Sequence, residues 1–183
     1  MCAGDVQLKL VNAVKDDPEE TSLSGLAGGC CFDFNRVSEH LFIVGTEEGK
    51  IHKCSKAYSG QYLETYVGHH LAVYTIRWNP FHAGVFISCS ADWTVKLWNQ
   101  KDQQAAWSFH SVDLADVVHD IAWSPTNATV FASVTGDGRI EIWDLQHSTI
   151  DPVIRAFSAG GGAGAAAAAP TNTPPPPPGK ARG

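Results

Sequence analysis

The chain has 183 residues, 44% of them hydrophobic, which fits one globular domain. Its 13 basic and 19 acidic residues give a formal net charge of −6. This charge argues against a nucleic-acid partner, because phosphate binding needs a basic surface. The N-terminus has no basic flank followed by an apolar core, and no apolar run approaches the roughly 20 residues that span a bilayer. We therefore expect neither secretion nor a membrane partner.

The cysteines number five and form no CxxC pair. This usage indicates reduced thiols in an intracellular protein. A zinc site built from Cys30, Cys31, His52 and Cys54 is an alternative, but its spacing fits no standard zinc motif. The sequence therefore predicts no metal and no cofactor.

Residues 1–27 predict an N-terminal strand followed by an acidic loop. The stretch VQLKLV at 6–11 alternates apolar and polar residues, which favours a short strand. The segment DDPEETSLSG at 16–25 is acidic and contains proline, as a solvated connector would.

Residues 28–66 are a degenerate copy of the repeat that follows. The run LFIV at 41–44 is continuously apolar, as expected for a strand covered on both faces. Glu48-Gly49 supplies a tight turn, since glycine accepts positive φ without steric cost. Alternation around Tyr58, Tyr62 and Tyr66 predicts an outer strand.

The clearest pattern is a repeat of 45 residues. Residues 73–99, VYTIRWNPFHAGVFISCSADWTVKLWN, return without a gap as 118–144, VHDIAWSPTNATVFASVTGDGRIEIWD. Each copy contains three short strands separated by turn residues, and a copy ending in Trp-Asn or Trp-Asp is typical of a β-propeller blade. We predict an all-β, WD40-type propeller of about three blades at 28–66, 67–110 and 111–157.

Residues 158–183 predict a disordered tail. The stretch GGGAGAAAAAP is followed by TNTPPPPPGKARG, and such tracts bury too little apolar surface to offset their ordering entropy. The five consecutive prolines favour an extended spacer, with a ligand for a proline-binding groove as the alternative.

Three long motifs carry a family resemblance. They are CFDF at 31–34, FIVGTEEGKIHKCSKAYSGQYLETY at 42–66 and SCSADWTVKLW at 88–98. The chain resembles WD-repeat proteins, and more narrowly the C-terminal propeller of axonemal dynein intermediate chains of the outer-arm type. The similarity extends from about residue 28 to 145 and is weaker over TVFASVTGDGRIEIWDL at 129–145.

The WD-repeat resemblance implies a buried hydrogen-bonded set in each blade. In the second copy the matching residues are His69, Ser88, Asp92 and Trp98. The carboxylate and the hydroxyl can satisfy the two imidazole nitrogens, and the indole N–H needs an acceptor.

The third copy keeps only part of this set. It has Ser133, Asp137 and Trp143, but Leu114 stands where the histidine would be. The network is therefore expected to be incomplete in the third blade and absent from the first.

The presence of Ser, His and Asp in one blade also suggests a hydrolase. The sequence contains no nucleophile elbow and no oxyanion-hole loop, so we expect the chain not to be an enzyme. Burial of Ser88 would exclude the hydrolase alternative.

The dynein resemblance implies a non-catalytic scaffold subunit of the ciliary or flagellar motor. Its implied partners are a dynein heavy chain and the other dynein intermediate chain, with the axonemal microtubule contacted indirectly. In that family a long N-terminal extension carries light chains; this sequence lacks it, so light-chain binding is not expected. The alternative function is a generic WD-repeat adaptor in ubiquitin ligation, trafficking or chromatin.

One turn breaks the local pattern. The turns between the second and third strands of the copies read Glu48-Gly49, Asp92-Trp93 and Asp137-Gly138. Glycine suits such a turn and tryptophan does not. Because tryptophan is enriched at interface hot spots, we hypothesise that Trp93 contacts the heavy chain, with packing against a neighbouring loop as the alternative.

Three blades are fewer than a ring contains. Propellers close with typically four to eight blades, and closure protects the sheet edges. We therefore expect this chain alone to form an open arc of marginal stability that tends to associate.

Overall fold

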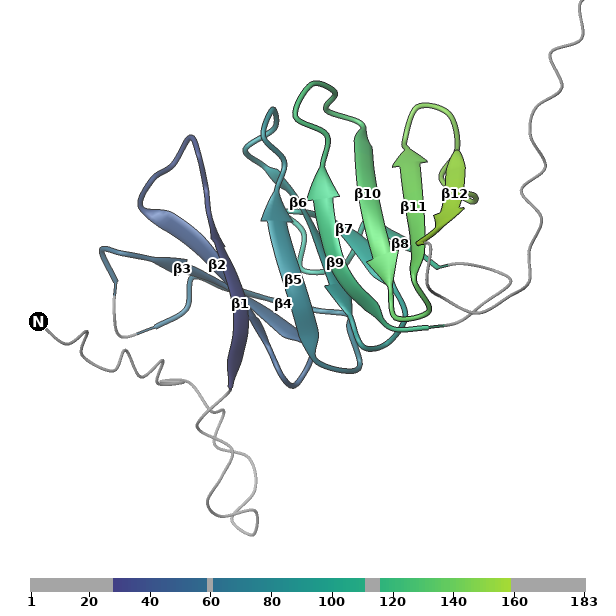
Figure 1. The fold of residues 1–183 in the computed structure, drawn as a ribbon. Coiled ribbons are helices and arrows are strands. Elements are labelled where there is room, and N and C mark those ends of the chain that lie inside the picture. The colour runs from purple at the N-terminus through teal and green to yellow at the C-terminus, as the bar shows by residue number, and fades with distance from the viewer. Residues whose placement is uncertain (1–27, 59–60, 111–115, 159–183) are drawn as a thin grey trace, which may run out of the picture.

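The computed structural model describes residues 28–58, 61–110 and 116–158 (Figure 1). The expectations for residues 1–27 and for the tail from 159 onward lie outside the described residues. Within the described ranges, no helix is long and apolar enough to cross a membrane.

The described residues form three antiparallel sheets of four strands, each ordered as the chain runs. The first sheet comprises β1 (Gly29–Phe34), β2 (Leu41–Thr46), β3 (Lys50–Ser55) and β4 (Glu64–Val67). The second comprises β5 (Val73–Trp78), β6 (Val85–Ser90), β7 (Val95–Asn99) and β8 (Trp107–Phe109). The third comprises β9 (Val118–Trp123), β10 (Val130–Thr135), β11 (Arg139–Asp144) and β12 (Ile154–Phe157). The predicted all-β partial propeller is confirmed, and each sheet is one blade.

The outer strand of the first blade is shorter than its tyrosine alternation suggests. Pairing with β3 begins at Glu64. Upstream of it, the Tyr62 ring stacks on His52, with ring centroids 4.0 Å apart and planes 9° apart. Tyr62 therefore covers a buried histidine instead of extending the ladder.

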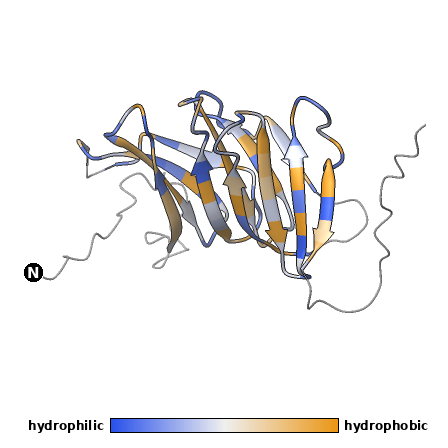
Figure 2. Ribbon diagram, turned by 45° about the horizontal axis from the view of Figure 1, so that its top comes forward, coloured by the Kyte–Doolittle hydropathy of each residue, from blue (hydrophilic) through white to orange (hydrophobic). Residues whose placement is uncertain are grey.

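The blades stand side by side through their inner strands. The strand β1 lies next to β5, and β5 lies next to β9 (Figure 1). Hydrophobic residues are concentrated on the strands and hydrophilic ones on the connecting loops (Figure 2). Consecutive sheets therefore bury their facing sides against each other.

An aromatic cluster fills the junction between the first and second blades. The rings of Phe86 and Trp98 are stacked in parallel, with centroids 5.9 Å apart. Tyr66, from the outer strand of the first blade, meets Phe86 edge to face at 5.1 Å. All three side chains are buried, so the outer strand of one blade is fixed to the middle of the next.

The second junction repeats this geometry one blade later. Phe131 and Trp143 are stacked with centroids 6.1 Å apart, and Phe109 meets Phe131 edge to face at 5.3 Å. The 45-residue repeat is therefore a repeat of the contact between blades as well as of the blade.

Buried asparagines link the turns of neighbouring blades. The amide of Asn35 donates to the carbonyl of Ala83, and that of Asn79 donates to the carbonyl of Ala128, each at 2.8 Å. The side-chain oxygen of Asn79 also accepts from two backbone N–H groups of its own turn. Ser124 occupies the equivalent position in the third blade and accepts the same two turn bonds.

The two end faces of the arc expose apolar side chains. Phe34 is 46% exposed, whereas Trp78 at the equivalent position of the second blade is 4% exposed. At the other end Ile140 is 38% exposed, whereas the equivalent Val95 is buried. Both end faces thus carry the residue types that fill the junctions between blades. That copies of the chain associate through these faces stays a prediction.

The natural serine at 124 provides a test of the asparagine link. We expect Asn79→Ser to lower the free energy of unfolding by about 1 kcal/mol, because the turn bonds survive and only the bond between blades is lost. Asn79→Ala should cost about 2 kcal/mol, since the turn is also left unsatisfied. Urea unfolding measures both, with the exposed Asn127→Ser as control. Equal losses for the two Asn79 variants would contradict the link.

Candidate functional site

The second blade contains a buried four-residue hydrogen-bonded set. The imidazole Nδ1 of His69 lies 2.9 Å from Oδ2 of Asp92, and its Nε2 lies 2.7 Å from Oγ of Ser88. The indole N–H of Trp98 donates to the same Ser88 oxygen at 2.8 Å. The structure thus brings together all four residues that the WD-repeat resemblance singled out.

The partners of His69 assign its tautomer. Nδ1 carries the proton and donates to Asp92, while Nε2 accepts from the Ser88 hydroxyl. Burial lowers the pKa of His69, although the carboxylate of Asp92 partly opposes that shift. The imidazole is therefore neutral at pH 7.

Asp92 anchors the turn that follows β6. Burial alone would raise the pKa of this carboxyl, but hydrogen bonds from His69 and Thr94 outweigh burial and hold the pKa below its ordinary value. The same carboxylate accepts from the backbone N–H groups of His70 and Thr94, each at 3.1 Å. Asp92 thus fixes the loop before β5 to the turn between β6 and β7.

The glycine before the histidine has a steric role. A Cβ at Gly68 would lie 2.9 Å from Cη2 of Trp98, too close for two carbon atoms. Gly68 therefore lets the loop carrying His69 approach the indole ring closely enough for both residues to reach Ser88.

The third blade keeps only part of the set. The indole N–H of Trp143 donates to Ser133 Oγ at 3.3 Å. Asp137 accepts from the Thr135 hydroxyl and from the backbone N–H of Arg139. The expected substitution at Leu114 lies outside the described residues.

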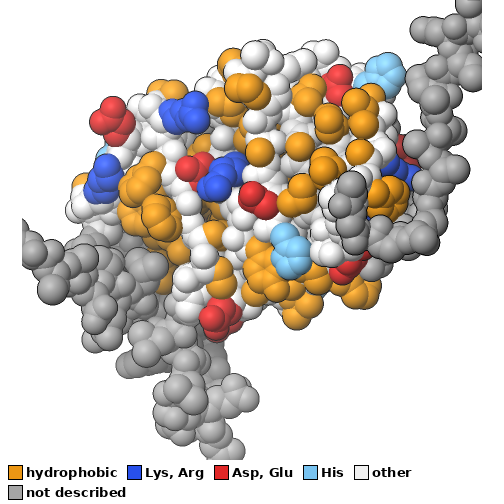
Figure 3. All heavy atoms as spheres, in the orientation of Figure 1, with side chains coloured by type: hydrophobic (Ala, Val, Ile, Leu, Met, Phe, Trp, Pro, Cys, Tyr) orange, Lys and Arg blue, Asp and Glu red, His pale blue; other side chains and the backbone are white. Residues whose placement is uncertain are grey.

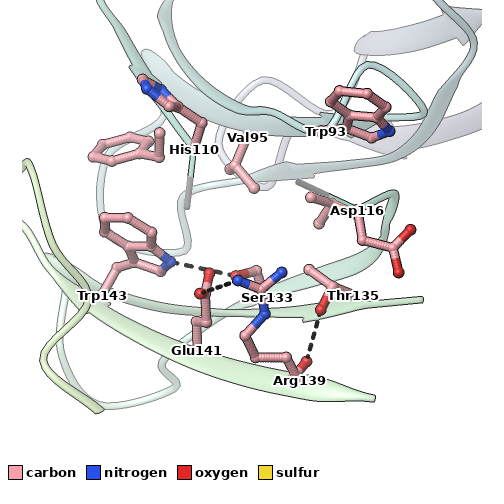
Figure 4. Close-up of a pocket in the computed structure, with 11 residues that line it drawn as sticks. Trp93, Val95, His110, Asp116, Ser133, Thr135, Arg139, Glu141 and Trp143 are labelled. Atoms are coloured by element: carbon pink, nitrogen blue, oxygen red, sulfur yellow. Dashed lines mark hydrogen bonds and ion pairs between the residues drawn. The ribbon is translucent and has the colours of Figure 1, made fainter. Parts of the chain in front are cut away.

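A buried ion pair in the third blade was missed by the sequence analysis. The guanidinium of Arg139 lies 3.3 Å from Oε1 of Glu141, and both side chains are buried (Figure 4). The same guanidinium lies 3.2 Å from Oδ2 of Asp137. The signal was present in the alternation RIEIW, because Arg139 and Glu141 share the strand face of Trp143.

The cleft between the second and third blades is very small. Val95, Phe109 and Val118 line it together with the polar residues of the third blade (Figure 4). It offers about 10 Å³, the space of about one water molecule. No organic cofactor fits there. Over the described ranges, no three His, Cys, Asp or Glu side chains are grouped to hold a metal ion, so the zinc alternative gains no support.

The hydrolase alternative is wrong. Ser88 is 0% exposed, and its hydroxyl oxygen already accepts from the indole of Trp98. A substrate carbonyl cannot approach this oxygen, although the Asp–His–Ser hydrogen bonds resemble those of a catalytic triad. The set is a buried hydrogen-bonded network inside the blade.

Trp93 occupies a glycine conformation. Its φ is +69°, and the equivalent turn residues Gly49 and Gly138 have φ of +83° and +82°. A bulky residue in this region strains the backbone by about 1–2 kcal/mol. The Trp93 side chain is 52% exposed, beside the small cleft.

Three four-stranded blades, Trp-capped repeats and the His–Ser–Asp–Trp set define a WD-repeat protein. A family model described as the dynein axonemal intermediate chain 3 WD40 domain matches residues 32–156, more than half of the chain. The chain therefore belongs to the WD-repeat dynein intermediate chains.

Individual relatives agree with this assignment. The chain is 60% identical over 94 residues to dynein intermediate chain 2, ciliary, of Heliocidaris crassispina, covering 51% of this chain and 13% of the relative. It is 52% identical over 94 residues to dynein axonemal intermediate chain 1 of Rattus norvegicus, with the same coverage.

A third relative covers more of the chain. Identity to dynein axonemal intermediate chain 4 of Homo sapiens is 46% over 140 residues, which is 76% of this chain and 16% of the relative. The chain thus spans about one seventh of the length of these relatives.

The hydrogen-bonded set predicts unequal costs for two serine substitutions. Ser88→Ala leaves His69 Nε2 and the Trp98 N–H buried without partners and should cost about 3 kcal/mol of unfolding free energy. Ser133→Ala removes one longer bond and should cost about 1 kcal/mol. Chemical denaturation compares the two, with the exposed Ser108→Ala as control. A loss at Ser133 as large as that at Ser88 would refute the central role of Ser88.

Proposed function

We propose that this chain is a non-catalytic scaffold subunit of axonemal dynein that binds a dynein heavy chain and supports ciliary or flagellar motility. The observation that carries the proposal is the match of residues 32–156 to a dynein intermediate chain WD40 domain. The relatives' names refer to the axoneme and the cilium. The same resemblance implies contact with the other dynein intermediate chain and indirect attachment to the axonemal microtubule.

The chemistry of the blades is consistent with a scaffold. Ser88 and His69 are buried away from any substrate, and the cleft between the second and third blades holds about one water molecule. Binding by such a protein has to use its surface, where side chains on rigid turns are held in fixed positions.

Trp93 is the surface residue that we assign to the heavy-chain contact. Its backbone strain and its exposed indole both cost free energy in the isolated chain, and glycine would avoid both. A large aromatic side chain on a rigid turn is the kind of anchor that dominates binding energy at interfaces. Function at an interface explains why tryptophan stands there.

Replacing Trp93 by glycine separates stability from binding. Trp93→Gly should raise the free energy of unfolding by about 1 kcal/mol, because the positive φ is no longer strained. It should also lower co-purification of dynein heavy chain with tagged protein from ciliated cells at least tenfold, as expected for loss of a hot spot.

The control for this experiment is Trp107→Ala. Trp107 is equally exposed but lies on the outer strand β8. Its loss should leave heavy-chain recovery unchanged. Normal heavy-chain recovery with Trp93→Gly would refute the assigned contact, whereas complete absence of heavy chain with the unmodified protein would refute the dynein function itself.

A further inference from the structure

A concave surface lies at the end of the blades opposite Trp93. In the β5–β6 ladder, Trp78 pairs with Phe86 at one end and Val73 pairs with Ser90, just before the Trp93 turn, at the other. The concavity lies at the Trp78 end and has a volume of about 390 Å³. We call it the inner-strand groove; the residues that define it are Asp33, Arg36, Arg77, Pro80, Trp123 and Pro125.

The repeat explains how three blades build one groove. Asp33 and Arg77 occupy equivalent places near the ends of the inner strands, 44 residues apart. Arg36, Pro80 and Pro125 occupy equivalent places in the turns that follow. Since β1, β5 and β9 lie side by side, these positions converge on one surface. Figure 3 shows that the face of these strands carries mostly hydrophobic side chains with a few charged ones among them.

The charges in the groove are available to a ligand. Over the described parts of the chain, neither Arg36 nor Arg77 has a carboxylate within 4.0 Å. The carboxylate in the lining, Asp33, accepts from the backbone N–H of Trp78 at 2.7 Å. The guanidinium of Arg77 donates to the backbone carbonyl of Ile76 at 3.2 Å, which leaves its other N–H groups for a ligand. The lining therefore holds two guanidinium groups and one carboxylate, and the carboxylate is bonded to the backbone.

The apolar part of the groove is rigid. The indole N–H of Trp123 donates to the backbone carbonyl of Arg77 at 3.2 Å, which holds the ring beside the end of β5. Pro80 and Pro125 add two surfaces of fixed backbone conformation. Guanidinium groups next to an aromatic ring and prolines suit a peptide that combines acidic and apolar side chains.

We propose that the inner-strand groove binds an acidic peptide segment of a partner protein. Carboxylates of the segment pair with Arg36 and Arg77, and an apolar side chain packs against Trp123 and the prolines. The volume lies within the range of small-ligand sites and accommodates a few residues. Asp33 is negatively charged and repels any anion in the groove. A phosphate group carries nearly twice the charge of a carboxylate, so Asp33 disfavours phosphate more than it disfavours a carboxylate. This proposal does not rest on the dynein assignment.

Fluorescence anisotropy with a defined probe tests the proposal. The probe is the labelled peptide EEPEEF, and the comparison peptide is QQPQQF. The full 183-residue chain should bind the acidic peptide at least tenfold more tightly than the glutamine peptide in low salt. Arg36→Glu and Arg77→Glu should each weaken binding of the acidic peptide at least tenfold.

The matched control is Lys101→Glu. Lys101 is exposed in the turn after β7, outside the groove, and its substitution makes the same change in net charge. Its binding should stay within about twofold of the parent chain. An equal loss of peptide affinity in Lys101→Glu would show that the attraction is non-specific and would overturn the proposal. Unchanged binding in both arginine variants would overturn it as well.

A second arginine variant and a phosphorylated peptide complete the test. Arg36→Gln removes the charge at an exposed turn position, so it yields a folded protein if Arg77→Glu does not. It should weaken the acidic peptide about threefold to tenfold. A phosphoserine peptide of the same length that binds more tightly than EEPEEF would overturn the assignment of a carboxylate ligand.

Discussion

The shared bond at the hydroxyl of Ser88 fixes the central blade. This one oxygen joins His69, on the loop before β5, to Trp98, on β7, and Ser88 itself lies on β6. The bonds hold the stacked rings of Trp98 and Phe86 in place, and the first blade inserts Tyr66 against them. Because both outer blades pack on the second blade, its internal alignment determines how the whole arc is arranged.

The third blade holds its turn carboxylate differently. Asp137 pairs with Arg139 on the adjoining strand, whereas Asp92 of the second blade accepts from His69 on the loop before β5. A buried pair of Arg139 and Glu141 fills the space beside Ser133. Burying the Arg139–Glu141 pair removes two charges from water, which costs hydration free energy. The set of the second blade buries one carboxylate, Asp92, which accepts four hydrogen bonds. We therefore expect stability to depend most on the second blade.

Much of this architecture could be predicted from the sequence. The 45-residue repeat gave the blades, and the glycine positions marked turns that do adopt positive φ. The Asn35 and Asn79 links could also have been found, since these residues recur 44 positions apart. The ion pair of Arg139 and Glu141 could have been predicted from the alternation along β11, which places both residues on the buried face. The inner-strand groove could not be predicted, because its shape depends on how three separate turns are placed in space.

The most direct test is an immunoblot of salt-extracted axonemes fractionated on a sucrose gradient. An antibody against residues 61–110 recognises a segment that the structure describes throughout. The account predicts that its signal co-sediments with dynein heavy chains and leaves the axoneme together with them at high salt. A signal confined to the cytosol, or one that never overlaps the heavy-chain fractions, would contradict the dynein function and favour a general WD-repeat adaptor.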